Sequence, residues 1–178
     1  MASSAEAKTN ATTPEEKDRG GKYLTFELGN ELYGIEILRV REIIGLMRIT
    51  TVPQAPNSIR GVINLRGKII PVVSLRAKFA MPARDEDADT CIIVVDVPHG
   101  EETVLTGLIV DSVSEVTQIG GEDIDDVPDL GEDFDASFML GIAKTDGRAS
   151  ILLNIDAVMP TAVYGPALAA VVKAVADG

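Results

Sequence analysis

One stretch decides the fold: Ile59-Arg60-Gly61-Val62-Ile63-Asn64-Leu65-Arg66-Gly67-Lys68-Ile69-Ile70-Pro71-Val72-Val73-Ser74-Leu75-Arg76. Two β-branched runs flank Leu65-Arg66-Gly67, a pattern typical of a β-hairpin with a short turn that contains glycine. Pro71 has no amide proton, so the second strand is expected at a sheet edge or bulged there. The hairpin would hold Arg66 at its tip, where a guanidinium can reach a partner.

Three further residues of this stretch are expected to shape the hairpin. Gly67 would permit a positive φ in the turn. Gly61 and Asn64 are expected to have structural roles.

Five ordered blocks of the chain resemble the signature of the CheW family, the coupling proteins of bacterial chemosensory arrays. The hairpin carries the Gly61…Asn64-Leu65-Arg66-Gly67…Pro71-Val72…Leu75-Arg76 pattern, with Ser74 where an aspartate is common. The other blocks are Glu31…Tyr33-Gly34-Ile35…Ile37…Val40…Glu42-Ile43, Gly107-Leu108-Ile109-Val110-Asp111…Val113…Glu115-Val116, Leu140-Gly141-Ile142-Ala143 and Ile151-Leu152-Leu153-Asn154-Ile155. The similarity spans residues 23–159, and ordered blocks are more specific than one short motif.

Composition indicates a β-rich protein without disulfides. Apolar residues make up 46% of the 178 residues but aromatic residues only 4%, so the core must consist of Val, Ile and Leu. The single Cys91 excludes an internal disulfide. The N-terminus lacks a signal-peptide pattern, and no apolar run is long enough to span a bilayer. We therefore expect a soluble, cytoplasmic protein.

Charge is distributed unevenly along the chain. Residues 1–80 carry 12 basic and 8 acidic side chains, and residues 81–178 carry 4 and 20, for a net charge of −12. The acidic second half disfavours nucleic-acid binding. We favour solubility as the role of this asymmetry, and the alternative is that oppositely charged surfaces steer protein partners.

We expect three regions: 1–22 as a disordered extension, 23–160 as the domain that the resemblance identifies as CheW-like, and 161–178 as a tail with a helix over 167–176. The polar loop 80–89 is the expected boundary between two subdomains. Residues 36–44 fit both helical and strand spacing, and the family resemblance favours a short helical turn followed by a strand. That strand would place Val40 and Glu42 on the same side.

Short, regularly spaced strands and little helix predict an all-β fold of barrels. The resemblance implies two packed five-stranded β-barrels, similar to Src-homology-3-like barrels, with short helical turns.

The sequence lacks the residues that catalytic and ligand-binding motifs require, so no catalytic, metal-binding or cofactor-binding residue is predicted. One histidine and one cysteine leave only Cys91 with His99 as a thiol–imidazole pair, and a small core thiol fits Cys91 better. Gly61…Gly67-Lys68 has the wrong spacing for a phosphate loop. A calcium loop that starts at Asp126 in the acidic segment 120–135 would place Pro128 and Leu130 at ligand positions and Ser137 where a closing glutamate is needed.

The resemblance implies a non-catalytic adaptor that couples chemoreceptors to the histidine kinase CheA. Its expected partners are the helical receptor tips, the regulatory domain of CheA and other copies in rings, which places it at the membrane through receptor arrays without inserting. The residues matching the receptor-contact positions of the family are Val40, Glu42, Arg66, Val113 and Val116. The alternative roles are core packing for Val113 and Val116, and an internal pair with Glu42 for Arg66.

Two other functions are weighed against this one. A CheW-like scaffold could serve a non-flagellar chemosensory system, with twitching or second-messenger output. From another class, an enzyme or a metal or small-ligand binder could use the acidic segment 120–135.

Overall fold

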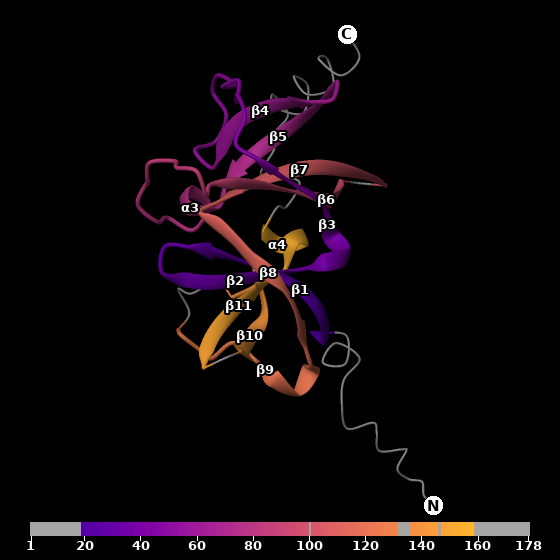
Figure 1. The fold of residues 1–178 in the computed structure, drawn as a ribbon, viewed down its shortest axis with the longest axis vertical. Helices are drawn as coiled ribbons and strands as arrows, with labels where there is room; N and C mark the ends of the chain where they lie inside the picture. Colours follow the sequence, from indigo (N-terminus) through magenta and orange to yellow (C-terminus); the bar gives the residue numbers. More distant parts are fainter. Residues whose placement is uncertain (1–18, 100, 132–135, 146, 159–178) are drawn as a thin grey trace, which may run out of the picture.

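The computed structural model describes residues 19–99, 101–131, 136–145 and 147–158, which form two β-sheets packed on each other (Figure 1). The chain crosses between the sheets twice, so the five-stranded sheet uses one continuous segment and the six-stranded sheet combines strands from before and after it. This two-sheet, mostly β architecture confirms the predicted fold class.

The six-stranded sheet combines the first and the last strands. Its order is β8-β1-β2-β11-β10-β9, with β1 (Gly21–Leu28), β2 (Glu31–Glu36), β8 (Ser112–Ile119), β9 (Ile124–Asp125), β10 (Met139–Thr145) and β11 (Arg148–Leu153). All pairs are antiparallel except β2 with β11. The sixth strand, beyond the five expected, is the two-residue β9.

The five-stranded sheet contains the central part of the chain. Its order is β3-β6-β7-β5-β4, with β3 (Val40–Gly45), β4 (Ile59–Leu65), β5 (Lys68–Ser74), β6 (Cys91–His99) and β7 (Glu102–Val110). The β5–β7 pair is parallel and the others are antiparallel. The predicted hairpin is therefore β4–β5.

Helical elements are short: η2 (Ile37–Arg39), α3 (Leu75–Lys78), η3 (Gly121–Asp123) and α4 (Ile155–Val158). The sequence η2 then β3 confirms the predicted helical turn followed by a strand. Ser74 caps α3, because its Oγ accepts a hydrogen bond from the amide of Ala77 at 3.2 Å. In Figure 1, α4 lies between the two sheets.

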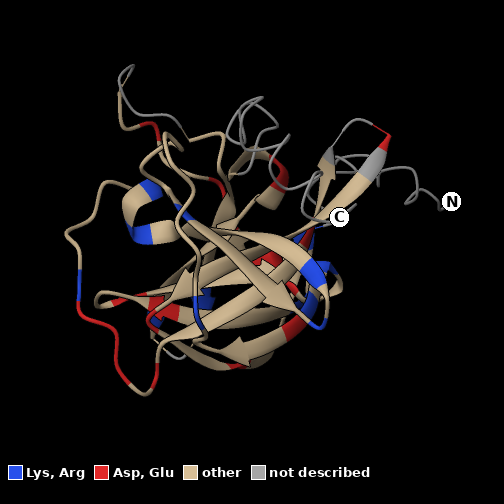
Figure 2. Ribbon diagram, turned by 90° about the horizontal axis from the view of Figure 1, so that it is seen from above, with Lys and Arg blue, Asp and Glu red and all other residues tan. Residues whose placement is uncertain are grey.

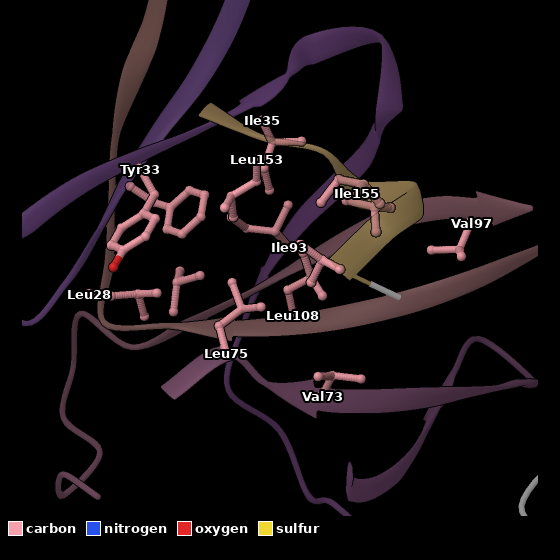
Figure 3. Packing of buried hydrophobic residues seen from close by; sticks show 14 of the residues in the cluster. Leu28, Tyr33, Ile35, Val73, Leu75, Ile93, Val97, Leu108, Leu153 and Ile155 are labelled. Carbon is pink, nitrogen blue, oxygen red and sulfur yellow. The ribbon is translucent and has the colours of Figure 1, made fainter. Parts of the chain in front are cut away.

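The largest apolar cluster, which we call the inter-sheet core, lies where the sheets face each other (Figure 3). Leu28, Tyr33 and Leu153 enter it from the six-stranded sheet, and Val73 and Ile93 from the five-stranded sheet. Two smaller clusters each belong to one sheet. Alternate residues of β6 divide between the inter-sheet core and the five-stranded sheet's own core, which explains why the whole strand is apolar.

The subdomain boundary predicted at 80–89 is not where the chain changes sheets. Those residues connect α3 to β6, both within the excursion through the five-stranded sheet. The crossings lie at η2, between β2 and β3, and at Asp111, between β7 and β8. The polar residues and proline correctly indicated a long loop, whose basic and then acidic side chains are coloured in Figure 2. They could not locate the subdomain boundary, because a loop within one sheet has the same composition as a loop between two sheets.

The expected disorder of residues 1–22 is corrected at the end of that range. Disorder is wrong for residues 19–22, because β1 begins at Gly21 and the Arg19 guanidinium lies 2.9 Å from Asp126 and 3.2 Å from the Leu140 carbonyl oxygen. Residues 1–18 and the expected tail at 161–178 lie outside the described residues.

Pro71 does not mark an edge strand. β5 lies between β4 and β7, and its parallel pairing with β7 begins at Val72, immediately after the proline. The bulge lies in β4 instead, between Ile59 and Gly61. Proline is tolerated here because the β7 pairing starts one residue later.

Candidate functional site

The tip of the β4–β5 hairpin is a two-residue turn. Leu65 pairs with Lys68, while Arg66 and Gly67 both have positive φ, 52° and 88°. Positive φ at both central positions is the requirement of a type I′ turn, which matches the twist of the strands. The Asn64 side-chain oxygen accepts a hydrogen bond from the Gly67 amide at 2.8 Å. The turn thus fixes the direction in which Arg66 leaves the hairpin.

Gly61 holds the base of the hairpin against the segment that precedes it. Its φ is 147°, and a Cβ there would lie 2.1 Å from the carbonyl oxygen of Thr50. Thr50 and Val62 exchange two backbone hydrogen bonds of 2.8 and 2.9 Å beside it. This close approach needs a residue without a side chain.

Arg66 and Glu42 form a forked ion pair between opposite ends of the five-stranded sheet. The guanidinium donates through both terminal nitrogens to the two carboxylate oxygens, with one contact at 3.2 Å. The hydrogen bond from Arg66 lowers the pKa of Glu42. Glu42 lies on β3 and Arg66 at the end of β4, so the pair ties the two edge strands of this sheet together. The Arg66 side chain remains 69% exposed.

Val40 and Glu42 do not share a side of β3, contrary to the prediction. Val40 lies opposite Val95 and Glu42 opposite Val94, with Arg41 as the extra residue of a bulge between them. Directly opposed residues point to the same face, and neighbours on β6 point to opposite faces. The bulge therefore turns Val40 toward the inter-sheet core, while Glu42 faces the other way.

Ile43, and not Glu42, is the residue that shares a face of β3 with Val40. It lies opposite Ile93, a residue of the inter-sheet core, and is 43% exposed. Val40 and Ile43 thus project toward the same face although they are three residues apart. Sequence reasoning missed Ile43 because alternate residues share a face only in a strand without a bulge. No residue of β3 indicates a bulge from its type alone.

A second bulge gives β8 the same arrangement. Val113 lies opposite Phe26 and Val116 opposite Leu24, with Ser114 as the extra residue. Both valines therefore face the inter-sheet side. Val113 packs against the core, whereas Val116 is 50% exposed.

We use the name inter-sheet edge surface for four apolar residues of these two edge strands that face the inter-sheet side: Val40, Ile43, Val113 and Val116. Strands β3 and β8 are the edges of their sheets, and each contributes one inner and one exposed apolar side chain. The structure brings Arg66 and Glu42 into contact on the other side of β3, which faces away from the inter-sheet core. Exposed apolar side chains that adjoin a core make these edges the candidate protein-binding surface.

The acidic segment carries ordinary ion pairs in its described part. Asp126 lies 2.9 Å from Arg19, and Asp125 lies 3.4 Å from Lys144. Residues 132–135 lie outside the described residues. Among the residues that the structure describes, no group of three or more His, Cys, Asp or Glu could hold a metal ion, and no helix is long and apolar enough to cross a membrane.

Comparison with known proteins gives one consistent result. Residues 22–163 match the family model of the CheW-like domain. The chain is 35% identical to the chemotaxis protein CheW of Rhizobium meliloti, covering 80% of this chain and 89% of that protein. It is 38% identical to the chemotaxis protein CheW of Klebsiella aerogenes, covering 77% and 80%.

A solved structure is similar to this protein in both fold and sequence. The scaffolding protein TtCheW from Thermoanaerobacter tengcongensis superposes with a TM-score of 0.71 at 37% identity, covering 81% of this chain and 90% of that one. These similarities confirm the predicted family, and with it the prediction that the protein is not an enzyme, because the family is a non-catalytic scaffold family. The chain belongs to the CheW family, the non-catalytic coupling and scaffold proteins of chemotaxis.

Proposed function

We propose that this protein binds the helical tip of a chemoreceptor through the inter-sheet edge surface and couples it to CheA. The observation that carries the proposal is the pair of bulged edge strands, which expose Ile43 and Val116 beside a common core. A helix of a receptor tip offers apolar side chains at i, i+3 and i+4, which suit two such rows. The protein would then reside at receptor arrays.

Arg66 supplies the polar part of the proposed contact. Its pairing with Glu42 uses the two terminal nitrogens of the guanidinium and leaves other N–H donors for an acceptor on the receptor. The internal and the external roles are therefore compatible. Glu42 would orient the guanidinium before binding, which reduces the entropy lost on association.

The kinase side of the proposal rests on family membership. The regulatory domain of CheA is itself CheW-like, so contacts between similar sheets could join the two proteins and further copies into rings. Reconstitution tests both partners: purified protein mixed with CheA and receptor signalling fragments should raise the rate of kinase autophosphorylation. Failure to co-sediment with either partner would contradict the proposal.

Replacing Arg66 with alanine is expected to weaken receptor-tip binding about tenfold while the fold is retained. The lost contact is a charge-assisted hydrogen bond, and about 1.4 kcal/mol corresponds to tenfold in affinity. Titration calorimetry with a receptor-tip fragment measures the affinity, and thermal denaturation measures stability. Arg148→Ala is the matched control, because Arg148 is an exposed arginine on β11 of the other sheet. Large thermal destabilisation with unchanged affinity would assign Arg66 to the internal role alone.

Replacing Val116 with aspartate is expected to reduce receptor-tip affinity more than tenfold. The side chain is half exposed, so the fold tolerates the charge, but a bound helix would bury an unpaired carboxylate. Ala149→Asp, at an exposed position on β11, controls for added negative charge, because β11 is separated from β8 by two strands. Equal affinities of the two variants would place the receptor elsewhere.

A further inference from the structure

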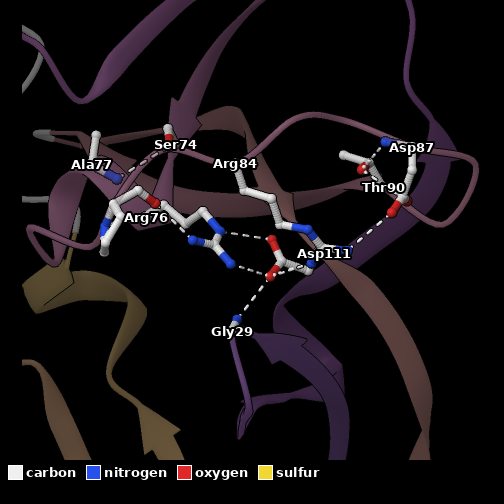
Figure 4. Close-up of polar contacts among 9 residues, drawn as sticks. Gly29, Ser74, Arg76, Ala77, Arg84, Asp87, Thr90 and Asp111 are labelled. Carbon is white, nitrogen blue, oxygen red and sulfur yellow. Dashed lines mark hydrogen bonds and ion pairs between the residues drawn. The ribbon is translucent and has the colours of Figure 1, made fainter.

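The carboxylate of Asp111 is the centre of a buried ionic cluster (Figure 4). One oxygen accepts from Arg76 Nε at 2.9 Å, and the other accepts from Arg76 Nη2, the Gly29 amide and Arg84 Nη1, each at 2.7 Å. The Asp111 side chain is only 10% exposed and that of Arg76 16%. Nothing in the proposed receptor contact uses these groups.

The cluster joins the two sheets at a crossing point of the chain. Asp111 is the only residue between β7 of one sheet and β8 of the other. Its amide donates to the Glu27 carbonyl oxygen at 3.1 Å, and its side chain accepts from Gly29, so it is tied to the β1–β2 turn. Arg76 belongs to α3, which follows β5 of the five-stranded sheet.

The loop 80–89 folds over this junction. Arg76 Nη1 donates to the Pro82 carbonyl oxygen at 2.7 Å, and Arg84 bridges Asp111 and Asp87. Asp87 is held in turn by Thr90, which donates from its hydroxyl and accepts from the Asp87 amide. A chain of alternating charges, Arg76–Asp111–Arg84–Asp87, therefore fastens the loop to the crossing point.

Such a cluster fixes orientation in a way that the apolar core does not. Burial of apolar surface is non-directional, so by itself it does not specify one angle between two packed sheets. A planar guanidinium paired through two nitrogens with one carboxylate restricts both distance and angle. A buried ion pair often adds little net stability compared with apolar residues of the same shape, and in some proteins its role is to specify one arrangement.

We propose that Asp111, clamped by Arg76 and Arg84, is a positioning residue that sets the angle between the two sheets and thereby the geometry of the inter-sheet edge surface. Val113 and Val116 follow Asp111 directly on β8, whereas Val40 and Ile43 lie on β3 of the other sheet. Rotation of one sheet against the other would change the separation of these two rows. The functional part of this inference rests on the proposed receptor binding, but the structural part does not.

The test measures the sheet-to-sheet geometry and the affinity separately. Spin labels at Lys68→Cys and Gln118→Cys, exposed positions in different sheets, report the distance between the sheets in a Cys91→Ser background. Labels at Gln118→Cys and Ala149→Cys report a distance within the six-stranded sheet. In the Asp111→Asn variant, double electron–electron resonance should show a shifted or broadened distance between the two labels on different sheets. The distance between the two labels on the six-stranded sheet should stay unchanged.

Affinity is measured on unlabelled protein with a recombinant helical-hairpin fragment of a chemoreceptor tip. Asp111→Asn should bind about fivefold to tenfold more weakly, because its apolar rows are no longer held at one separation. Arg84→Gln, which removes the 42% exposed partner, should shift both readouts in the same direction but less, and it serves if Asp111→Asn folds poorly. Asp96→Asn is the control, since Asp96 pairs with Arg41 inside one sheet.

An unchanged distance across the sheets in both variants would overturn the inference, whatever the affinity. A changed distance with native affinity would overturn the link to binding. If the native protein itself does not bind the fragment, the proposed function fails, and the distance measurement still decides whether Asp111 sets the angle.

Discussion

Gly61→Ala is expected to lower the free energy of unfolding by about 3 kcal/mol or more. The new Cβ would lie 2.1 Å from the Thr50 carbonyl oxygen and 2.8 Å from its carbon. The backbone there has a φ of 147°, which residues with a side chain rarely adopt. Relief requires breaking the Thr50–Val62 backbone bridge, which holds the segment after β3 against β4.

Chemical denaturation followed by circular dichroism measures this effect. Gly45→Ala is the matched control, because Gly45 also lies in a strand of the same sheet, but a Cβ added there would meet nothing within 4 Å and its φ is ordinary. We expect the control to stay close to the native protein. A Gly61→Ala variant with the native midpoint would show that the Thr50 segment moves freely.

Acidification is expected to destabilise the protein through Asp111, by about 2 kcal/mol between pH 5 and pH 2. Burial alone would raise the pKa of Asp111, but hydrogen bonds from Arg76, the Gly29 amide and Arg84 outweigh it and lower the pKa to about 2. An unfolded aspartate has a pKa of about 3.9. The folded state thus favours the charged form, so the stabilisation is complete above the unfolded pKa and is lost as the pH falls toward the folded pKa.

Comparison of the native protein with Asp111→Asn isolates this contribution. Glu42 and Asp87 also have lowered pKa values, owing first to Arg66 and to the Asp89 amide respectively, and they act in the same direction in both proteins. The difference in unfolding free energy between the two proteins should therefore be largest at neutral pH and shrink in acid. A difference independent of pH would mean that the charge of Asp111 does not stabilise the fold.

Local patterns predicted most of the strands. Alternation of Leu24 and Phe26 with polar neighbours gave β1, and the turn residues Arg66 and Gly67 gave the β4–β5 hairpin. These elements are determined by side-chain period and turn chemistry within a few residues. The pairing of Arg66 with Glu42, weighed as an alternative from sequence, is present in the structure.

Long-range pairing was beyond the same reasoning. Strand β2 pairs in parallel with β11, so Leu32 lies beside Ser150 from the far end of the domain. Nothing in the composition of either strand specifies that partner. The bulges at Arg41 and Ser114 were also missed, because a bulge depends on the opposing strand as much as on its own residues. These bulges decide which side chains line the inter-sheet edge surface.

The parallel β2–β11 pair also constrains how the chain can fold during synthesis. All strands of the five-stranded sheet lie between residues 40 and 110, so that sheet has its complete sequence before β8 leaves the ribosome. Strands β1 and β2 are synthesised first, but their outer edges cannot pair until β8 and β11 have been synthesised. Non-local pairing of this kind is slow and leaves strand edges open in the meantime. The earliest-made hairpin is thus the last to be completed, and the five-stranded sheet can form as a template against which it settles.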